Sequence, residues 1–350
     1  MKKRYTSIWV LGVALSFLPG LMGTAAGAQA AKGKNWPKIL TIASSPGGTA
    51  GNFLAAALGK QIEDKLGVPV TVTVSIGAAA ARMVAKGEAD LAVPNDVNFY
   101  NAVRGIGAFK KQGKLPLRYL TFTYTLLINL MARDGIDTFA KLKGKRVMFN
   151  YPTAPQFMAE GDALLKFHGM TRKDVVLLKS TGAKDVSDAL VARTADAGMR
   201  AGPANGSPAI KDTARKVDLT FISLSKAEVD FVIKEAPYLS PATLPAGIYK
   251  GQAKAVKTTA IGQNLVIHRD IPDDLVFEIA KILMDSAGRN KPGNFTQYHK
   301  SLSWNLQDNV DQLYRRIGPF HPGVVRYLKT RGVWTPEMDQ IQAEMLKLAQ

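Results

Sequence analysis

Residues 39–66, ILTIASSPGGTAGNFLAAALGKQIEDKL, show the pattern of a strand, a loop of small residues and a helix. Residues 39–42 are mainly apolar, which is typical of a short buried strand. Residues 44–51 contain only Ser, Pro, Gly, Thr and Ala. The next residues have apolar side chains at helical spacing, with Asn52 as the expected helix cap and Gly67 just beyond the helix end.

The loop of this unit is predicted to hold a small anion. A helix start exposes unpaired N–H groups and carries a partial positive charge. The small side chains leave room for a ligand, and the Ser and Thr hydroxyls can donate hydrogen bonds. We therefore expect an anion site at residues 44–51.

Composition indicates a folded chain that carries no disulfide chemistry. The 350 residues are 46% hydrophobic, which is enough for about two domains, and there is no cysteine. The net charge of +18 would suit a nucleic acid, an anionic surface or an acidic small ligand. Basic residues are dispersed in short clusters and no basic stripe is interleaved with aromatic residues, so nucleic acid is not an expected partner.

The first residues have the features of a secretory signal peptide. Lys2, Lys3 and Arg4 precede the apolar run 8–22, and small residues follow it. The apolar run is too short for a typical membrane anchor. We expect residues 1–28 to be a cleaved signal peptide and the protein to be periplasmic.

Strands alternate with helices after residue 66, which predicts parallel sheets. Residues 70–74, 89–93, 145–149 and 175–178 read as strands, and each is followed by a loop and a helical pattern. The second series starts roughly a hundred residues after the first and repeats its plan. Ligands on such sheets lie beyond the carboxyl ends of the strands.

Two long apolar runs, residues 125–133 and 259–269, flank the second series. We interpret them as strands that cross between two lobes and form the hinge. The expected fold is α/β, a two-lobed periplasmic-binding-protein fold (type II-like), with two doubly wound sheets joined by two hinge strands and with C-terminal helices. The expected domains are a discontinuous lobe 1, residues 35–128 and 265–350, and lobe 2, residues 129–264.

The chain lacks the common motifs of catalysis and of cofactor binding. The glycines near the first strand do not form G-x-G-x-x-G, and no G-x-x-x-x-G-K-[ST] occurs. No G-x-S-x-G elbow is present, and the four histidines show no metal-ligand spacing. We expect no enzyme activity, no catalytic residues, no cofactor and no metal.

Several segments resemble the TAXI family, the solute receptors of TRAP (tripartite ATP-independent periplasmic) transporters. The segments are Thr41–Thr49 (TIASSPGGT), Gly87–Ala92 (GEADLA) with Asp96, Leu142–Val147 (LKGKRV), Leu244–Gln252 (LPAGIYKGQ) and His321–Gly323 with Tyr327. The resemblance implies a periplasmic receptor that closes on a small carboxylate, such as an amino acid or a dicarboxylate. It also implies delivery to membrane permease subunits of the transporter, and a monomer is expected.

Nine residues are the predicted ligand contacts, and in this scheme the bound ligand favours the closed form of the hinge. From the first lobe these are Ser44, Ser45, Gly48, Thr49, Asn95 and Tyr100; from the second they are Thr153, Gln156 and Arg200. Arg200 is the best candidate for a bidentate pair with the anion. The alternative is that Ser44, Ser45 and Thr49 only cap the turn and that Arg200 is a surface arginine.

Other functions of the same fold stay open. One is the substrate-binding protein of an ATP-driven importer for a sulfonate or a thiamine precursor. Another is a periplasmic ligand sensor that feeds a membrane kinase. Loss of uptake on gene deletion would separate transport from sensing.

Overall fold

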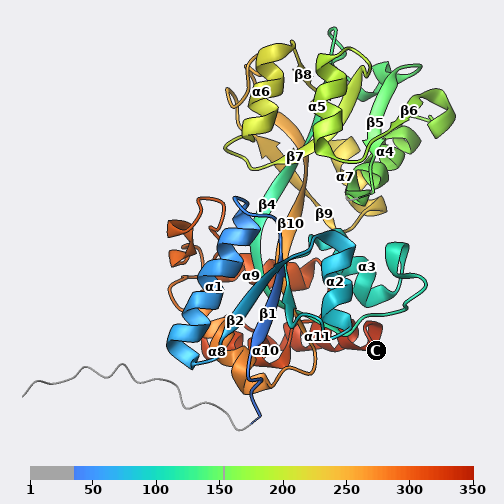
Figure 1. Cartoon of the computed structure of the whole chain (residues 1–350). Coiled ribbons are helices and arrows are strands. Elements are labelled where there is room, and N and C mark those ends of the chain that lie inside the picture. Colours follow the sequence, from blue (N-terminus) through green and yellow to red (C-terminus); the bar gives the residue numbers. More distant parts are fainter. Residues whose placement is uncertain (1–34, 153) are drawn as a thin grey trace, which may run out of the picture.

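The structure is a computed structural model that describes residues 35–152 and 154–350. The predicted signal peptide, residues 1–28, lies outside the described residues. Figure 1 shows two lobes, one above the other, joined by two long strands that run from one lobe to the other. The two-lobed α/β fold predicted from the sequence is confirmed.

The lower lobe in Figure 1 combines the beginning and the end of the described chain. Its N-terminal elements are β1 (Leu40–Ser44), α1 (Ala50–Leu66), β2 (Val70–Val74), α2 (Gly77–Ala85), β3 (Leu91–Ala92), α3 (Asp96–Arg104) and the short 3₁₀ helix η1 (Gly107–Phe109). Its C-terminal elements are α8 (Asp273–Met284), η4 (Asn294–Gln297), α9 (Leu306–Tyr314), α10 (Pro322–Thr330) and α11 (Pro336–Leu348).

The upper lobe is formed by the middle of the chain. Its elements are η2 (Phe139–Leu142), β5 (Arg146–Asn150), α4 (Pro155–Phe167), η3 (Arg172–Asp174), β6 (Val176–Lys179), α5 (Ala183–Val191), β7 (Ala197–Gly202), α6 (Pro208–Lys216), β8 (Thr220–Phe221), α7 (Lys226–Glu235) and β9 (Leu239–Leu244). The strand and helix pattern predicted for both lobes is thus present, with ends that differ by a few residues.

The crossing strands are β4 (Leu117–Ala132) and β10 (Val256–His268). They pair antiparallel with each other, so the strands of both lobes form one ten-stranded sheet of order β2-β1-β3-β10-β4-β7-β5-β6. β8 pairs with β4 and β9 pairs with β10. The sequence suggested two sheets joined by hinge strands, whereas the hinge strands themselves make the two halves continuous.

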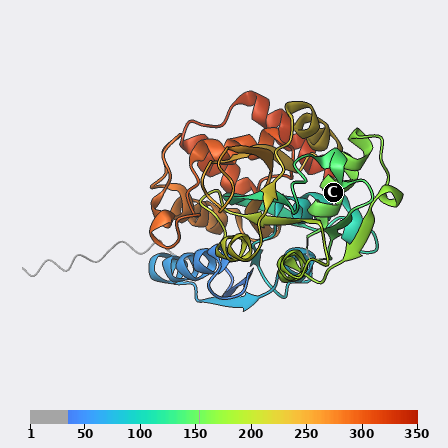
Figure 2. The ribbon, with the colours of Figure 1, turned by 90° about the horizontal axis from the view of Figure 1, so that it is seen from above.

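Each lobe has its own hydrophobic core. Along β4 the buried side chains change from the first core to the second between Tyr124 and Leu127. Along β10 the change falls between Ile261 and Leu265. The domain boundaries at 128/129 and 264/265 stay a prediction. Figure 2 shows the C-terminal helices (red) on the opposite side of the crossing strands from α1 (blue).

The helix cap of α1 differs from the prediction. Thr49, not Asn52, is the N-cap, and its Oγ1 accepts a hydrogen bond from the backbone N–H of Asn52 at 3.3 Å. Gly67 ends the helix in the left-handed conformation, with φ of 67°, as the sequence predicted. The helix begins earlier because the threonine hydroxyl reaches the first turn, and the pattern of apolar residues alone does not locate that hydroxyl.

Candidate functional site

A pocket of about 410 Å³ lies between the two lobes, beside the crossing strand β4. It is lined by Phe122, Thr123, Tyr124, Thr125 and Leu127 of β4, by Pro203, Ala204 and Asn205 after β7, and by Lys300, Ser301, Ser303 and Asp308 of the C-terminal region. We call it the interlobe pocket. Both lobes contribute to it, so a solute bound there would be contacted from both sides of the hinge.

The predicted anion loop lies next to this pocket. Tyr124, which lines the pocket, lies near the backbone N–H of Gly51, and burial raises the pKa of Tyr124 to about 12. The rings of Phe53 and His299 stack with their centres 5.6 Å apart, just before pocket residue Lys300. The first turn of α1 is therefore held against the pocket wall from two directions.

The loop hydroxyls mostly stabilise the loop itself. Ser44 is fully buried, and its Oγ donates to the carbonyl oxygen of Gly51 at 2.8 Å. Thr49 Oγ1 donates to the carbonyl oxygen of Pro46 at 2.8 Å and caps α1. Ser45 is partly exposed and Gly48 is exposed, so these two keep access to solvent. For Ser44 and Thr49 the observed contacts are those of the capping alternative, and a ligand role for all four stays a prediction.

Asn95 and Tyr100 are placed by α3. Asn95 is the N-cap of this helix, and its Oδ1 accepts from the N–H of Asn98 at 3.1 Å. Tyr100 lies on the opposite lobe from Tyr238, and the two rings meet edge to face with centres 5.6 Å apart. Tyr100 thus takes part in a contact between the lobes, and its role in ligand binding stays a prediction.

Arg200 is the most informative residue of the second lobe. It is only 9% exposed, so it is not a surface arginine. Its Nη1 donates to Ser187 Oγ, and its Nε has no hydrogen-bond partner among the described residues. No carboxylate within the described ranges forms an ion pair with it. Burial lowers the pKa of Arg200. A buried guanidinium without a carboxylate is costly unless another anion compensates it.

Gln156 lies in the first turn of α4. Gln156 is 4% exposed, and its Oε1 finds no donor among the described residues. This side chain can therefore accept a hydrogen bond from a polar ligand or from water. Thr153 lies outside the described residues, and its role stays a prediction.

None of the nine predicted residues lines the interlobe pocket itself. Arg200 pairs with Asn129 across the sheet, while Gly202, two residues further along β7, pairs with pocket residue Leu127. Sequence analysis missed the polar residues of β4 and of residues 300–308. A signal existed in β4, because Thr123 and Thr125 alternate within an otherwise apolar run. No comparable pattern marks Lys300 or Ser303.

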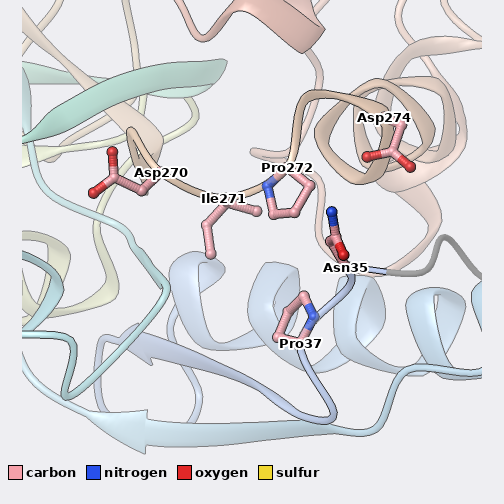
Figure 3. Close-up of a pocket in the computed structure, with 6 residues that line it drawn as sticks. All are labelled: Asn35, Pro37, Asp270, Ile271, Pro272 and Asp274. Carbon is pink, nitrogen blue, oxygen red and sulfur yellow. The ribbon is translucent and has the colours of Figure 1, made fainter.

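A larger open pocket, of about 630 Å³, is a poorer candidate. Figure 3 shows its lining, which consists of Asn35, Pro37, Asp270, Ile271, Pro272 and Asp274. All of these residues come from lobe 1, so no hinge motion would close it. Asp270 and Asp274 lie at opposite ends of the pocket, and Asp274 Oδ2 accepts from Trp36 Nε1 at 2.8 Å. Two carboxylates disfavour an anionic ligand.

Within residues 35–152 and 154–350, no His, Asp and Glu side chains cluster in a way that could hold a metal ion. None of the helices in that part of the chain combines the length and the apolar character that a bilayer span requires.

Comparison with known proteins identifies the family. A family model described as the NMT1-like family matches residues 43–332. The chain belongs to the NMT1-like family. The match covers most of the described residues, including both crossing strands and all elements around the interlobe pocket.

The solved structures to which this NMT1-like protein is similar share little sequence with it. PhnD1 from Prochlorococcus marinus, solved in complex with methylphosphonate, is 12% identical, with a TM-score of 0.50 over 76% of this chain and 92% of that chain. A putative sulfonate ABC transporter periplasmic sulfonate-binding protein, SsuA from Methylobacillus flagellatus, is 15% identical, with a TM-score of 0.48 over 89% of this chain and 95% of that chain. At 12% identity, the likeness to PhnD1 is one of fold alone.

The family match corrects the more specific prediction from sequence. The quoted segments suggested the TAXI receptors of TRAP transporters, whereas the matching family is the NMT1-like one. The fold expected from the resemblance is retained, and the TAXI and TRAP assignment is not.

Proposed function

We propose that this protein is a solute-binding receptor that captures a small oxyanion between its two lobes. The observation that carries the proposal is the interlobe pocket, to which β4, residues 203–205 and residues 300–308 all contribute. A ligand that touches both lobes binds the closed arrangement more tightly and so shifts the hinge equilibrium towards it.

The anionic character of the ligand is supported by charge and burial. The pocket lining contains one ammonium, Lys300, and one carboxylate, Asp308. The further positive charge is Arg200, which is buried without a carboxylate partner among the described residues. The sequence carries a net charge of +18, which raises the local concentration of anions. Hydroxyl, amide and ammonium donors suit carboxylate, sulfonate and phosphonate groups alike, so the proposed class is small organic oxyanions.

The proposed setting is the periplasm, with delivery to an ATP-driven importer. The signal-peptide pattern of residues 1–28 supports export. The importer is supported by the fold shared with named importer components, such as the sulfonate-binding protein above. Uptake of the ligand by cells should disappear when the gene is deleted and when ATP is depleted. Uptake that persists without ATP and depends on an ion gradient would contradict the importer.

Binding can be tested by thermal unfolding of protein freed of carried-over ligand. The panel contains succinate, glutamate, ethanesulfonate, methylphosphonate and a neutral sugar. A ligand at 100 times its Kd stabilises the folded protein by about 2.7 kcal/mol. We expect at least one oxyanion to raise the Tm and the sugar to leave it unchanged. A shift by the sugar alone would exclude an oxyanion receptor.

Arg200→Met tests whether Arg200, which does not line the interlobe pocket in the arrangement described, contacts the bound oxyanion. Methionine retains apolar packing and removes the charge, so we expect a loss of oxyanion binding of at least tenfold in calorimetric titration, or about 1.4 kcal/mol. Arg215→Met is the matched control, because Arg215 is an exposed arginine of the same lobe. Equal affinities for the two variants would remove Arg200 from the site and leave the receptor function intact.

A further inference from the structure

A buried ion pair lies where β10 passes from one lobe to the other. Arg315 Nη2 is 3.0 Å from Asp96 Oδ2, and the Asp96 side chain is fully buried. The carboxylate also accepts from the backbone N–H of Gly262 at 3.0 Å and from Asn264 Nδ2 at 2.6 Å. The register of β10 against β4 shifts between Gln263 and Asn264. Asp96 therefore holds the irregular part of a crossing strand.

Gly262 is required for this contact. A Cβ atom at position 262 would lie 2.7 Å from Asp96 Oδ2 and 3.1 Å from its Cγ, closer than real Cβ contacts. The carboxylate approaches the strand backbone only because no side chain is present there. The close approach of α3 to β10 at this point therefore depends on a glycine at position 262.

Arg315 also reaches the other lobe. Its Nη2 donates to the carbonyl oxygen of Tyr238 at 2.8 Å, and its Nη1 donates to Gln312 Oε1 at 2.7 Å. Tyr238 directly precedes β9, and its side chain packs against both hydrophobic cores. One guanidinium therefore connects α3, α9 and the lobe 2 segment before β9.

This network is separate from the interlobe pocket. Asp308, in the first turn of α9, lines the pocket, whereas Arg315 immediately follows the last residue of the same helix. Seven residues of helix separate the two positions by about 10 Å.

We propose that Arg315, held by Asp96, is an interlobe latch that restricts the angle between the lobes without touching the ligand. The proposal rests on the proposed receptor function, because only there does the lobe angle set affinity. The Arg315–Tyr238 contact is present in the arrangement described, and every rotation that separates these two residues must break it. A hydrogen bond from a charged donor shifts the balance between two arrangements about tenfold.

The lobe angle can be measured directly, in the absence of ligand. The sequence has no cysteine, so Lys60→Cys on α1 and Lys184→Cys on α5 give a unique pair of spin-label sites. Both side chains are largely exposed, and each pairs only with an aspartate of its own helix. Pulsed electron spin resonance then gives the distribution of distances between the lobes.

Arg315→Lys is the first variant. Lysine keeps a positive charge near Asp96 but has no planar fork with which to reach Gln312 and Tyr238 as well. We expect a broader distance distribution than in the parent, including distances that the parent does not populate. Arg316→Ala is the matched control, because its side chain pairs with Glu344 within lobe 1 at 3.0 Å. The control should superimpose on the parent.

A second variant guards against a folding defect. Removing one member of a buried ion pair leaves an uncompensated charge, so Asp96→Asn with Arg315→Gln replaces both members by neutral groups of similar shape. This double variant should also broaden the distribution. If both variants fold and superimpose on the parent, the latch does not exist. Because the readout needs no ligand, that result is distinguishable from a failure of the receptor function.

Discussion

Glu160 is a carboxyl group with almost no access to water. It lies on α4, is 1% exposed, and its Oε2 accepts a hydrogen bond from Thr259 Oγ1 of β10 at 2.8 Å. Burial raises the pKa of Glu160 to about 8, and the Thr259 hydroxyl offsets this in part. The Glu160 carboxyl group, which contacts the crossing strand β10, is therefore mainly protonated at neutral pH.

The pKa of Glu160 predicts a loss of stability at alkaline pH. Its folded-state pKa is above the unfolded value of 4.5, so the contribution is fully present below pH 4.5. This contribution to the free energy of unfolding is lost as the pH rises through about 8, because the unfolded state releases the proton of Glu160 at lower pH than the folded state does. Glu160→Gln resembles the protonated acid and cannot ionise.

We expect Glu160→Gln to be close to the parent in free energy of unfolding at pH 5 and more stable than the parent at pH 9. Urea denaturation at the two values measures the difference. Equal loss of stability in both proteins between pH 5 and pH 9 would show that another group titrates.

Single residues also show the limits of prediction from sequence at this scale. Arg200 was predicted to contact the ligand, and that role stays a prediction. The sequence left open whether Arg200 is a surface residue, because its burial depends on tertiary packing. Ser44 and Thr49 were recognised as hydroxyls in a turn, and the sequence alone left open whether they cap the turn or bind a ligand. That distinction depends on hydrogen-bond geometry, such as the 2.8 Å contact of Thr49 Oγ1 with the Pro46 carbonyl.

At the level of elements, a loop residue, Thr49, contributes to the stability of helix α1 by capping it. Thr49 Oγ1 satisfies the N–H of Asn52, which otherwise has no intrahelical partner. Thr49→Ala should therefore reduce the free energy of unfolding by about 1 kcal/mol. Thr49→Ser keeps the hydroxyl and should lose much less. Urea denaturation of both variants measures the effect, and equal losses would show that the methyl group matters instead.

Elements were predictable where their pattern is local. Helix α8, Asp273–Met284, is such an element, with apolar side chains at helical spacing along its length. The crossing strand β4 begins at Leu117, well before the predicted residue 125. Its first half contains Arg118, Thr121 and Thr123, which are buried in the structure although their types favour exposure. Thr121 is buried because Asn309 of α9 accepts its hydrogen bond at 2.9 Å, and no sequence pattern connects residues so far apart.

At the level of the whole molecule, two cores share two strands. Tyr124 and Leu127 of β4 belong to different cores although they are three residues apart, and β10 pairs with β4 from Ala260 to His268. Unfolding of either lobe would therefore disrupt β4 and β10, whose side chains also form part of the core of the other lobe. We expect one cooperative thermal transition, with calorimetric and van't Hoff enthalpies in agreement. Two resolved transitions in scanning calorimetry would contradict this expectation.

The two-lobed architecture was predictable because each lobe repeats the same local order of strands and helices. The interlobe pocket was not, since it combines β4, residues 203–205 and residues 300–308. The latch between Arg315 and Tyr238 likewise joins positions 77 residues apart. Sequence patterns indicate the structure of residues that are close along the chain. The interlobe pocket and the Arg315–Tyr238 contact both need residues after β10, where the chain enters lobe 1 again.

The return of the chain to lobe 1 has a consequence for the order in which the polypeptide folds during synthesis. The second lobe is complete once β10 has emerged. The first lobe must wait for the C-terminal segment, which brings Trp304, Phe320 and Tyr327 into its core. A nascent chain that ends soon after residue 268 would therefore display a finished lobe 2 beside an N-terminal segment with an open apolar face. Any chaperone that escorts this protein would be needed chiefly for the part that is made first.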